Sequence, residues 1–246
     1  MSDYTLAIDG STYEGSVALL RGANVVAERT LKGEDGAAPR AGRGEKLMPA
    51  IADCLRDSGV KRGEIRCIVC GSGPGSFTSL RVAGSVAKGL AAGYGIDLYA
   101  VSSLLLTVTG AQPSLPSGEY LSVLDAMRGE FYAARVFVPP WLAPLPERGK
   151  DLTRPIKHGV SAVQTTPPAI ISGAELDEIS VKEREVKIIG PGRQIDARPH
   201  ARGVAPILDV VLAGAPVNLA SWEPDYGRLA EAQVRWEAAH GRKLTT

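Results

Sequence analysis

The chain has 246 residues, 44% hydrophobic and 22% charged, with a formal net charge of +1 at pH 7. It is long enough to bury a full core, and it lacks the basic excess of an autonomous nucleic-acid-binding protein, although a clustered patch is compatible with a neutral total. Three cysteines are too few for a disulfide framework, no signal peptide is predicted, and no apolar run approaches the roughly 20 residues that span a bilayer. We expect a soluble, cytoplasmic protein.

The first half of the chain alternates apolar runs with turns. Asp9-Gly10-Ser11-Thr12 is a turn cluster after the first run. Glu45–Ser58 has apolar residues at helical spacing, and a glycine turn leads into a second helix, Thr78–Tyr94. The predicted strands are Tyr4–Asp9, Ser16–Leu20, Asn24–Thr30, Ile65–Cys70 and Ile96–Val101. This order indicates a mixed sheet with helices packed on it.

A second unit is predicted to begin near Ser102. Its expected elements are strands at Tyr120–Leu124, Phe131–Val138, Ala169–Ser172 and Val186–Ile189, and helices at Pro206–Ala213 and Glu231–His240. Lys32–Arg43 and Pro139–Pro168 show little periodicity and predict no regular element. The expected division is an N-terminal lobe over 1–102, a second lobe over 103–215, and a C-terminal tail with a helix over 216–246.

The glycine turn Gly71-Ser72-Gly73-Pro74-Gly75 invites comparison with phosphate-binding loops. The dinucleotide fingerprint needs a glycine at the sixth position and an acid at the end of the next strand. Here Ser76 holds the sixth position and Asp97 starts the next strand, and no P-loop Gly-Lys-Ser/Thr follows. We interpret Gly73, Pro74, Gly75 and Phe77 as a structural turn.

The cysteines and histidines favour packing roles. Cys67 and Cys70 match C-x-x-C, but they lie inside an apolar strand, where residues i and i+3 point to opposite faces. We therefore expect buried structural cysteines. His158, His200 and His240 are scattered without metal-ligand spacing, and no metal site is predicted.

Two features leave functional alternatives open. Asp9 ends the first strand before Ser11 and Thr12, as in actin-like phosphotransferases that hold a nucleotide's phosphates and metal, although an acid capping its own turn is more common. The helix Thr78–Tyr94 carries small residues, and each internal glycine costs about 1 kcal/mol relative to alanine. Such a helix suits close approach, either by its own sheet or by a helix of another subunit.

Several motifs occur together along the chain. They are Leu6-Ala7-Ile8-Asp9 with Ser11-Thr12, Gly73-Pro74-Gly75-Ser76-Phe77-Thr78 with Leu80-Arg81, Ala87-Lys88-Gly89-Leu90-Ala91, Val101-Ser102-Ser103-Leu104, Asp125-Ala126 with Arg128-Gly129-Glu130-Phe131-Tyr132, and Pro224-Asp225-Tyr226 with Arg228 and Ala230-Glu231. Together they resemble the TsaB family, also called YeaZ. The match is dense in the first half and sparse in the rest.

The resemblance implies an α/β fold of two actin-like lobes (the acetate and sugar kinase, Hsp70 and actin superfamily, related to ribonuclease H), with mixed sheets flanked by helices. It also implies a non-catalytic subunit that binds and stabilises its paralogue TsaD, which an ATPase, TsaE, joins. That complex transfers a threonylcarbamoyl group to the anticodon-adjacent adenosine of tRNAs reading ANN codons. The chain alone is expected to need no cofactor, with ATP or ADP at the assembled complex, and to form a homodimer when isolated.

The expected partner interface lies on the two first-lobe helices and comprises Leu47, Ile51, Leu55, Leu80, Arg81, Ala83, Gly84, Ala87 and Ala91. Glu45–Ser58 lacks the paired histidines of the metal-binding paralogue, which argues for a partner rather than an enzyme. The alternative is a nucleotide-dependent phosphotransferase or ATPase using Asp9, Ser11 and Thr12, which otherwise form a degenerate nucleotide site. Arg43-Gly44, Ser79 and Ala83 depart from the family pattern near the expected interface.

Overall fold

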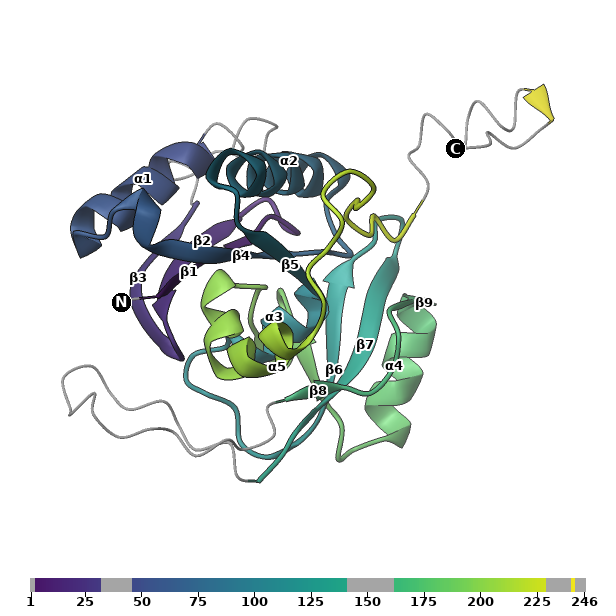
Figure 1. Ribbon diagram of the computed structural model, residues 1–246. Coiled ribbons are helices and arrows are strands. Elements are labelled where there is room, and N and C mark those ends of the chain that lie inside the picture. Colours follow the sequence, from purple (N-terminus) through teal and green to yellow (C-terminus); the bar gives the residue numbers. More distant parts are fainter. Residues whose placement is uncertain (1–2, 32–45, 141–161, 229–239, 242–246) are drawn as a thin grey trace.

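Two β-sheets, each covered by helices, make up the described part of the computed structural model, which comprises residues 3–31, 46–140, 162–228 and 240–241 (Figure 1). The first sheet has the order β3-β2-β1-β4-β5. Its strands are β1 (Tyr4–Asp9), β2 (Ser16–Arg21), β3 (Asn24–Thr30), β4 (Ile65–Gly71) and β5 (Asp97–Val101). The first three form an antiparallel meander, and β4 and β5 run parallel to β1.

Helices cover both faces of this first sheet. The helices α1 (Leu47–Ser58) and α2 (Phe77–Tyr94) lie side by side on one face, and the short helices η3 (Ala201–Ile207) and α5 (Leu208–Ala213) pack on the other (Figure 1). Along β1, Leu6 and Ile8 face α1 and α2, whereas Ala7 faces η3. All three are completely buried, because side chains alternate between the faces of a strand and both faces are covered.

The second sheet has the order β11-β10-β6-β7-β8, with β9 also pairing with β7. Its strands are β6 (Gly118–Asp125), β7 (Glu130–Val138), β8 (Val163–Gln164), β9 (Ala169–Ser172), β10 (Lys187–Gly190) and β11 (Ile195–Asp196). The helix α4 (Gly173–Lys182) packs on one face through Leu176, which contacts the cluster that contains Val123 and Ile188. A single turn of 3₁₀ helix, η2 (Arg62–Glu64), completes the described elements and leads into β4 of the first sheet.

The helix α3 (Ser103–Thr109) joins the two sheets. Leu106 belongs to the core of the first sheet, whereas Leu104 and Val108 belong to the core of the second. A helix buried on all sides carries no amphipathic period, which is why the sequence SLLLTVT gave no helical signal. The central connector of the fold was therefore missed.

Most predicted elements are confirmed with ends shifted by at most two residues. The helix α4 was also missed, although Ser172 and Glu175 form its capping box, with Ser172 Oγ accepting from the Glu175 amide at 3.1 Å. The helix expected over Pro206–Ala213 begins at Leu208, with η3 before it. The predictions for Lys32–Arg43, for residues 141–161 of the proline-rich segment and for residues 231–239 of the helix expected over Glu231–His240 lie outside the described residues.

The α/β architecture with two mixed sheets flanked by helices is confirmed. The lobe boundaries remain a prediction, and η3 and α5, which fall within 103–215, pack on the first sheet. Among the described residues, the helices are too short or too polar to cross a membrane.

Candidate functional site

The carboxylate of Asp9, at the end of β1, is completely buried. Its Oδ1 accepts hydrogen bonds from the Ser11 amide at 3.1 Å and the Ser11 hydroxyl at 2.7 Å, and its Oδ2 accepts one from Ser103 Oγ at 2.7 Å. Burial raises the pKa of Asp9 above its ordinary value, against the opposing effect of the hydrogen bonds from Ser103 and Ser11. Both carboxylate oxygens are therefore engaged by this chain's own groups.

The glycine turn after β4 closes over this carboxylate. A Cβ at Gly71 would lie 2.0 Å from Asp9 Oδ2, so that only glycine allows the close approach. Gly73 has a φ of +92°, and its amide donates to Ser103 Oγ at 3.1 Å, which continues the chain of hydrogen bonds to Asp9. The amide of Ser76 donates to the Ser11 carbonyl at 2.7 Å. The predicted structural turn thus joins the ends of β1 and β4 to the start of α3.

A C-terminal strap, defined here as residues 214–228, runs from α5 across the side of α2 (Figure 1). The Asp225 amide donates to the Ser72 carbonyl at 2.7 Å, and the rings of Phe77 and Tyr226 lie 4.6 Å apart. Tyr132 of β7 donates to the Tyr226 carbonyl at 3.1 Å. The strap therefore ties the second sheet to the glycine turn and to α2.

The residues expected at the partner interface mostly face this chain's own core, and that prediction needs correction. Leu47, Ile51, Leu80, Ala83, Ala87 and Ala91 are each at most 3% exposed and pack against the sheet or its surroundings. Gly84 is also buried, because the strap's Pro224 lies 2.9 Å from the place where a Cβ would stand. Leu55 is half-buried, and only Arg81 is exposed. Of the two alternatives for the small-residue helix, packing on its own sheet accounts for these side chains.

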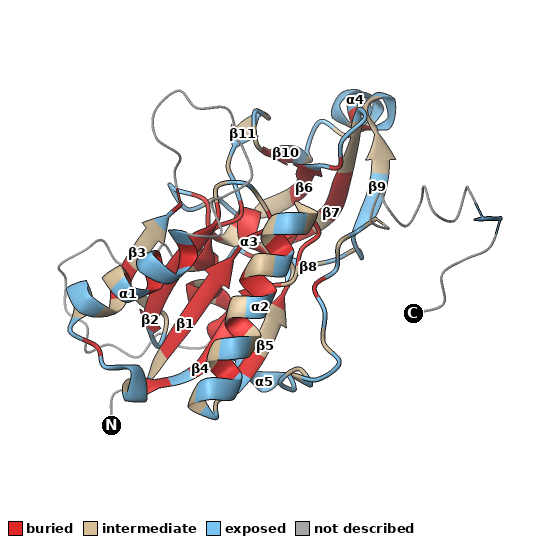
Figure 2. Ribbon diagram, turned by 90° about the horizontal axis from the view of Figure 1, so that it is seen from above, coloured by how far each residue is buried: buried red, intermediate tan, exposed pale blue. Residues whose placement is uncertain are grey.

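The outward faces of α1 and α2 carry a different set of residues, which we call the outer face. It comprises Met48 and Ala52 of α1 and Thr78, Arg81, Ser85, Gly89 and Ala92 of α2, all exposed (Figure 2). Ser79, one of the departures from the family pattern, is half-buried, and its hydroxyl lies 3.1 Å from Ser76 Oγ. The other departure on α2, Ala83, faces the core, and Arg43-Gly44 lies outside the described residues.

Arg81 is positioned by two aromatic rings at the edge of the outer face. Its guanidinium carbon lies 4.9 Å from the centroid of Phe77 and 6.0 Å from that of Tyr226. Cation–π contacts of this kind hold an arginine while its N–H groups stay accessible. The aromatic partner from the strap could not be foreseen, because Tyr226 is 145 positions away from Arg81 (226 minus 81).

The cysteines are structural, as predicted. All three are free and buried, and burial raises the pKa of the Cys54 thiol to about 11. His200 is buried too, and burial lowers its pKa to about 3. Within the described ranges, no group of three or more histidine, cysteine or acidic side chains is arranged to hold a metal ion.

The chain is similar to known proteins in sequence and in fold. The TsaD family model, described as tRNA N6-adenosine threonylcarbamoyltransferase, matches residues 25–138. The tRNA threonylcarbamoyladenosine biosynthesis protein TsaB of Escherichia coli K12 is 35% identical over 129 residues, 52% of this chain and 53% of that protein. The protein of the same name from Bacillus subtilis is 27% identical over 94% of this chain and 96% of its own length. The chain thus spans about half of the first relative and nearly all of the second.

Among solved structures, YeaZ from Pseudomonas aeruginosa superposes with a TM-score of 0.68, covering 91% of this chain and 99% of that chain at 23% sequence identity. At this identity the similarity establishes the fold alone. The two mixed sheets, the β3-β2-β1-β4-β5 order and the acid at the end of β1 define an α/β protein with an actin-like fold. Within that class, the chain is similar in sequence to proteins of the TsaB (YeaZ) family.

Proposed function

We propose that this chain is a non-catalytic scaffold subunit that binds a TsaD-type threonylcarbamoyltransferase and thereby supports the modification of tRNA. The observation that carries this proposal is the closed Asp9 site. In actin-like phosphotransferases the corresponding acid must reach a metal and phosphates, whereas here both carboxylate oxygens are engaged by Ser11 and Ser103 in a fully buried position. Such a site can hold the first lobe together, but the buried Asp9 carboxylate is not accessible to a metal ion or a phosphate group.

The outer face of α1 and α2 is the surface we assign to the partner. Its α2 stripe is small or polar, and the Cβ position of Gly89 has no heavy atom within 4 Å. Small side chains let a second helix approach closely, and the helices' own apolar faces are already used in the core. The same face would serve a homodimer of the isolated chain. Association of TsaE, nucleotide and tRNA belongs, in this proposal, to the assembled complex.

The alternative of a nucleotide-dependent phosphotransferase gains no support from the site. Gly71 leaves no space beside Asp9 Oδ2, and Ser11 is 2% exposed. Thr12 is only half-buried as a residue, but its hydroxyl oxygen is itself buried and lacks a hydrogen-bond partner among the described residues. Binding of Mg-ATP to the isolated chain, abolished by Asp9→Ala, would favour this alternative over the scaffold.

Size-exclusion chromatography with light scattering tests the docking surface. The chain is run alone and mixed with the TsaD-type protein of the same organism. Ser85→Arg places a long cation at the centre of the outer face, and because Ser85 is exposed the isolated variant is expected to stay folded. We expect the wild type to form a stoichiometric heteromer and Ser85→Arg to elute as the two separate proteins.

Val181→Arg is the matched control, since it adds the same side chain to an exposed position of α4 on the other sheet. It should bind as the wild type does. A folded Ser85→Arg variant with unchanged binding would contradict the assignment of the outer face. Ala87, one of the residues expected at the interface, is unsuitable for this test, because it is completely buried and a charge there would disrupt the core itself.

A further inference from the structure

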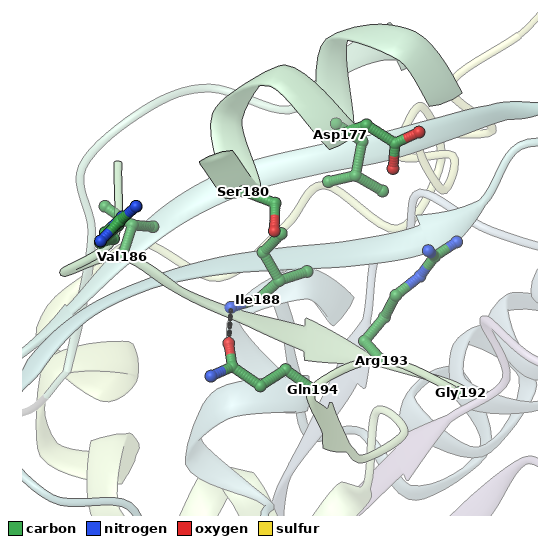
Figure 3. A pocket seen from close by; sticks show the side chains of 9 residues that line it. Asp177, Ser180, Val186, Ile188, Gly192, Arg193 and Gln194 are labelled. Carbon is green, nitrogen blue, oxygen red and sulfur yellow. Dashed lines mark hydrogen bonds between the residues drawn. The ribbon is translucent and has the colours of Figure 1, made fainter. Parts of the chain in front are cut away.

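A hollow of about 430 Å³ opens on the second sheet, between α4 and the turn that joins β10 to β11 (Figure 3). Its floor is apolar and contains Leu176, Val186 and Ile188. Its rim is polar and contains Asp177, Ser180, Arg184, Arg193 and Gln194. The volume falls within the range of about 300–1,000 Å³ that is typical of small-ligand sites.

Arg193 is held in place at the rim. Its guanidinium carbon lies 4.3 Å from the centroid of the Phe131 ring on β7, and its amide donates to the Gly190 carbonyl at 3.1 Å. A guanidinium stacked on a ring keeps its N–H groups free along its edge. In Figure 3 the Arg193 side chain rises from the turn toward Asp177 on α4. This arginine is pre-organised to donate into the hollow.

Arg184 supplies a second guanidinium from the loop after α4. The acid beside it in sequence, Glu183, is engaged by Arg135, which donates to its two oxygens at 2.8 and 2.7 Å. Over the described part of the chain, neither Arg184 nor Arg193 forms an ion pair. The rim therefore has two guanidinium groups outside any ion pair of the described residues and one acid, Asp177, which gives it a net charge of +1 (two minus one).

We propose that this hollow binds the phosphate group of a ribonucleotide, either free or within RNA. Guanidinium groups match phosphate oxygens in geometry and charge, and the Ser180 hydroxyl and Gln194 amide add donors at the same rim. The apolar floor suits the adjoining sugar or base. The hollow lies on the second sheet, away from α1 and α2 (Figures 1 and 2), so that it stays open when the outer face is occupied. The inference thus goes beyond the proposed docking function.

The test is an NMR titration of the full chain at about 150 mM salt, where distant charges are screened. The probes are inorganic phosphate, adenosine 5′-monophosphate and a short single-stranded oligoribonucleotide. We expect saturable shifts of residues around the hollow. Each of Arg184→Gln and Arg193→Gln should weaken binding by about tenfold, the value of one charge-assisted hydrogen bond. Asp177→Asn should tighten binding, because it removes the carboxylate that repels the phosphate.

Lys182→Gln is the matched control. It removes one positive charge from α4, close in sequence to Arg184, but Lys182 pairs with Glu178 and does not line the hollow. Unchanged affinity in this variant is expected. Equal weakening by Lys182→Gln and the arginine variants would overturn the proposal, as would no saturable binding of any probe. Preference for the oligoribonucleotide over the mononucleotide identifies RNA as the source of the phosphate, and the reverse preference identifies free nucleotide.

Binding of the arginine variants to the TsaD-type partner keeps the two proposals distinguishable. They should form the heteromer as the wild type does, because the hollow and the outer face are separate. Loss of ligand binding with intact docking therefore bears on the hollow alone, whereas failure of docking with intact ligand binding bears on the scaffold proposal alone.

Discussion

At the scale of single residues, Asp9 acts as a hub for backbone segments that are distant in sequence. It collects donors from the turn after β1 and from the start of α3, and Gly73 extends this network into the glycine turn. A buried carboxyl acceptor of this kind stabilises the folded chain only while all of its hydrogen-bond donors are in place. Its contribution should therefore appear in stability measurements on the isolated chain.

Replacing Asp9 tests this role. Asp9→Ala leaves the Ser11 and Ser103 donors without their acceptor, and we expect a loss of about 1–3 kcal/mol in the free energy of unfolding. Asp9→Asn keeps one acceptor oxygen and the side-chain shape, and its loss should be smaller. Urea denaturation followed by circular dichroism measures both variants. Equal stability of Asp9→Ala and the wild type would contradict the stabilising role assigned to Asp9.

His200 makes stability depend on pH. Its Nδ1 accepts from the Arg202 amide at 3.1 Å and its Nε2 lies 3.1 Å from Thr30 Oγ1, while burial, with a smaller effect of Arg202, lowers its pKa from 6.5 to about 3. Between these pH values the unfolded chain binds the proton and the folded chain does not. Stability should therefore fall as the pH decreases from about 6.5 toward about 3.

The measurement is a series of urea denaturations from pH 7 to pH 4, comparing the wild type with His200→Gln. The variant should have a flatter dependence on pH, because it lacks the titrating imidazole. The raised pKa of Asp9 acts in the opposite direction above its ordinary value of 3.8, and it is common to both proteins. Parallel curves for the two proteins would show that His200 is not the titrating group.

The sequence located Asp9 and the turn of Gly73, Pro74, Gly75 and Phe77, because an acid at a strand end and a glycine-rich turn are local signals. It did not identify Ser103 as a partner of Asp9, since the two residues are 94 positions apart. It also placed buried helix positions such as Leu80 and Ala87 at an interface. Apolar spacing indicates which side of a helix is buried, but the occupant can be the chain's own sheet or another subunit.

At the scale of elements, α2 contains two glycines with opposite surroundings. At Gly84 a Cβ would lie 2.9 Å from the ring of Pro224 in the strap, whereas at Gly89 it would meet no heavy atom within 4 Å. We expect Gly84→Ala to destabilise the chain by about 1–3 kcal/mol through overpacking. Gly89→Ala should stabilise it by about 0.5–1 kcal/mol, the difference in helix propensity.

Thermal or urea unfolding of the two isolated variants gives the comparison directly. Opposite signs are the expected result, and each variant is the control for the other, because both change glycine to alanine in one helix. Destabilisation by Gly89→Ala would mean that this position is not open. Stabilisation by Gly84→Ala would mean that the strap does not pack closely on α2.

Strands with clear apolar runs, such as β1 and β3, were predicted with correct ends, because they have strong β-forming residues and adjacent turns. The helices α3 and α4 were missed for different reasons. The first is buried on nearly all sides and so lacks an amphipathic period, and the second is short and exposed, with only Leu176 fully buried. For α4 the Ser172–Glu175 capping box was a usable signal.

At the scale of the whole molecule, the two sheets are connected through α3 and through the strap. Tyr132 of β7 donates to the strap, and Arg228 of the strap pairs with Glu130 beside it. The outer face lies over the first sheet and the hollow lies on the second, and these contacts connect the two sheets (Figures 1 and 2). Such an arrangement suits a subunit that contacts a protein partner on one side and a phosphate-bearing ligand on the other.

The motifs predicted the actin-like fold through their resemblance to a family, and some of them lie at the ends of elements, such as Asp9 at the end of β1 and Ser103 at the start of α3. The path of the strap could not be predicted from the sequence. Its contacts with Gly73, Gly84 and Tyr132 depend on the folded positions of three separate elements. Long-range packing of this kind leaves no periodic pattern in the strap itself.

The scaffold proposal is tested most directly by measuring threonylcarbamoyl transfer to tRNA in the reconstituted complex, with this chain supplied as wild type, Asp9→Asn or Ser85→Arg. We expect Asp9→Asn to support the wild-type rate whenever it is folded and bound to its partner, and Ser85→Arg to abolish transfer through loss of docking. A fall of about a hundredfold or more with a folded, bound Asp9→Asn subunit, the scale of losing a catalytic acid or base, would contradict the account.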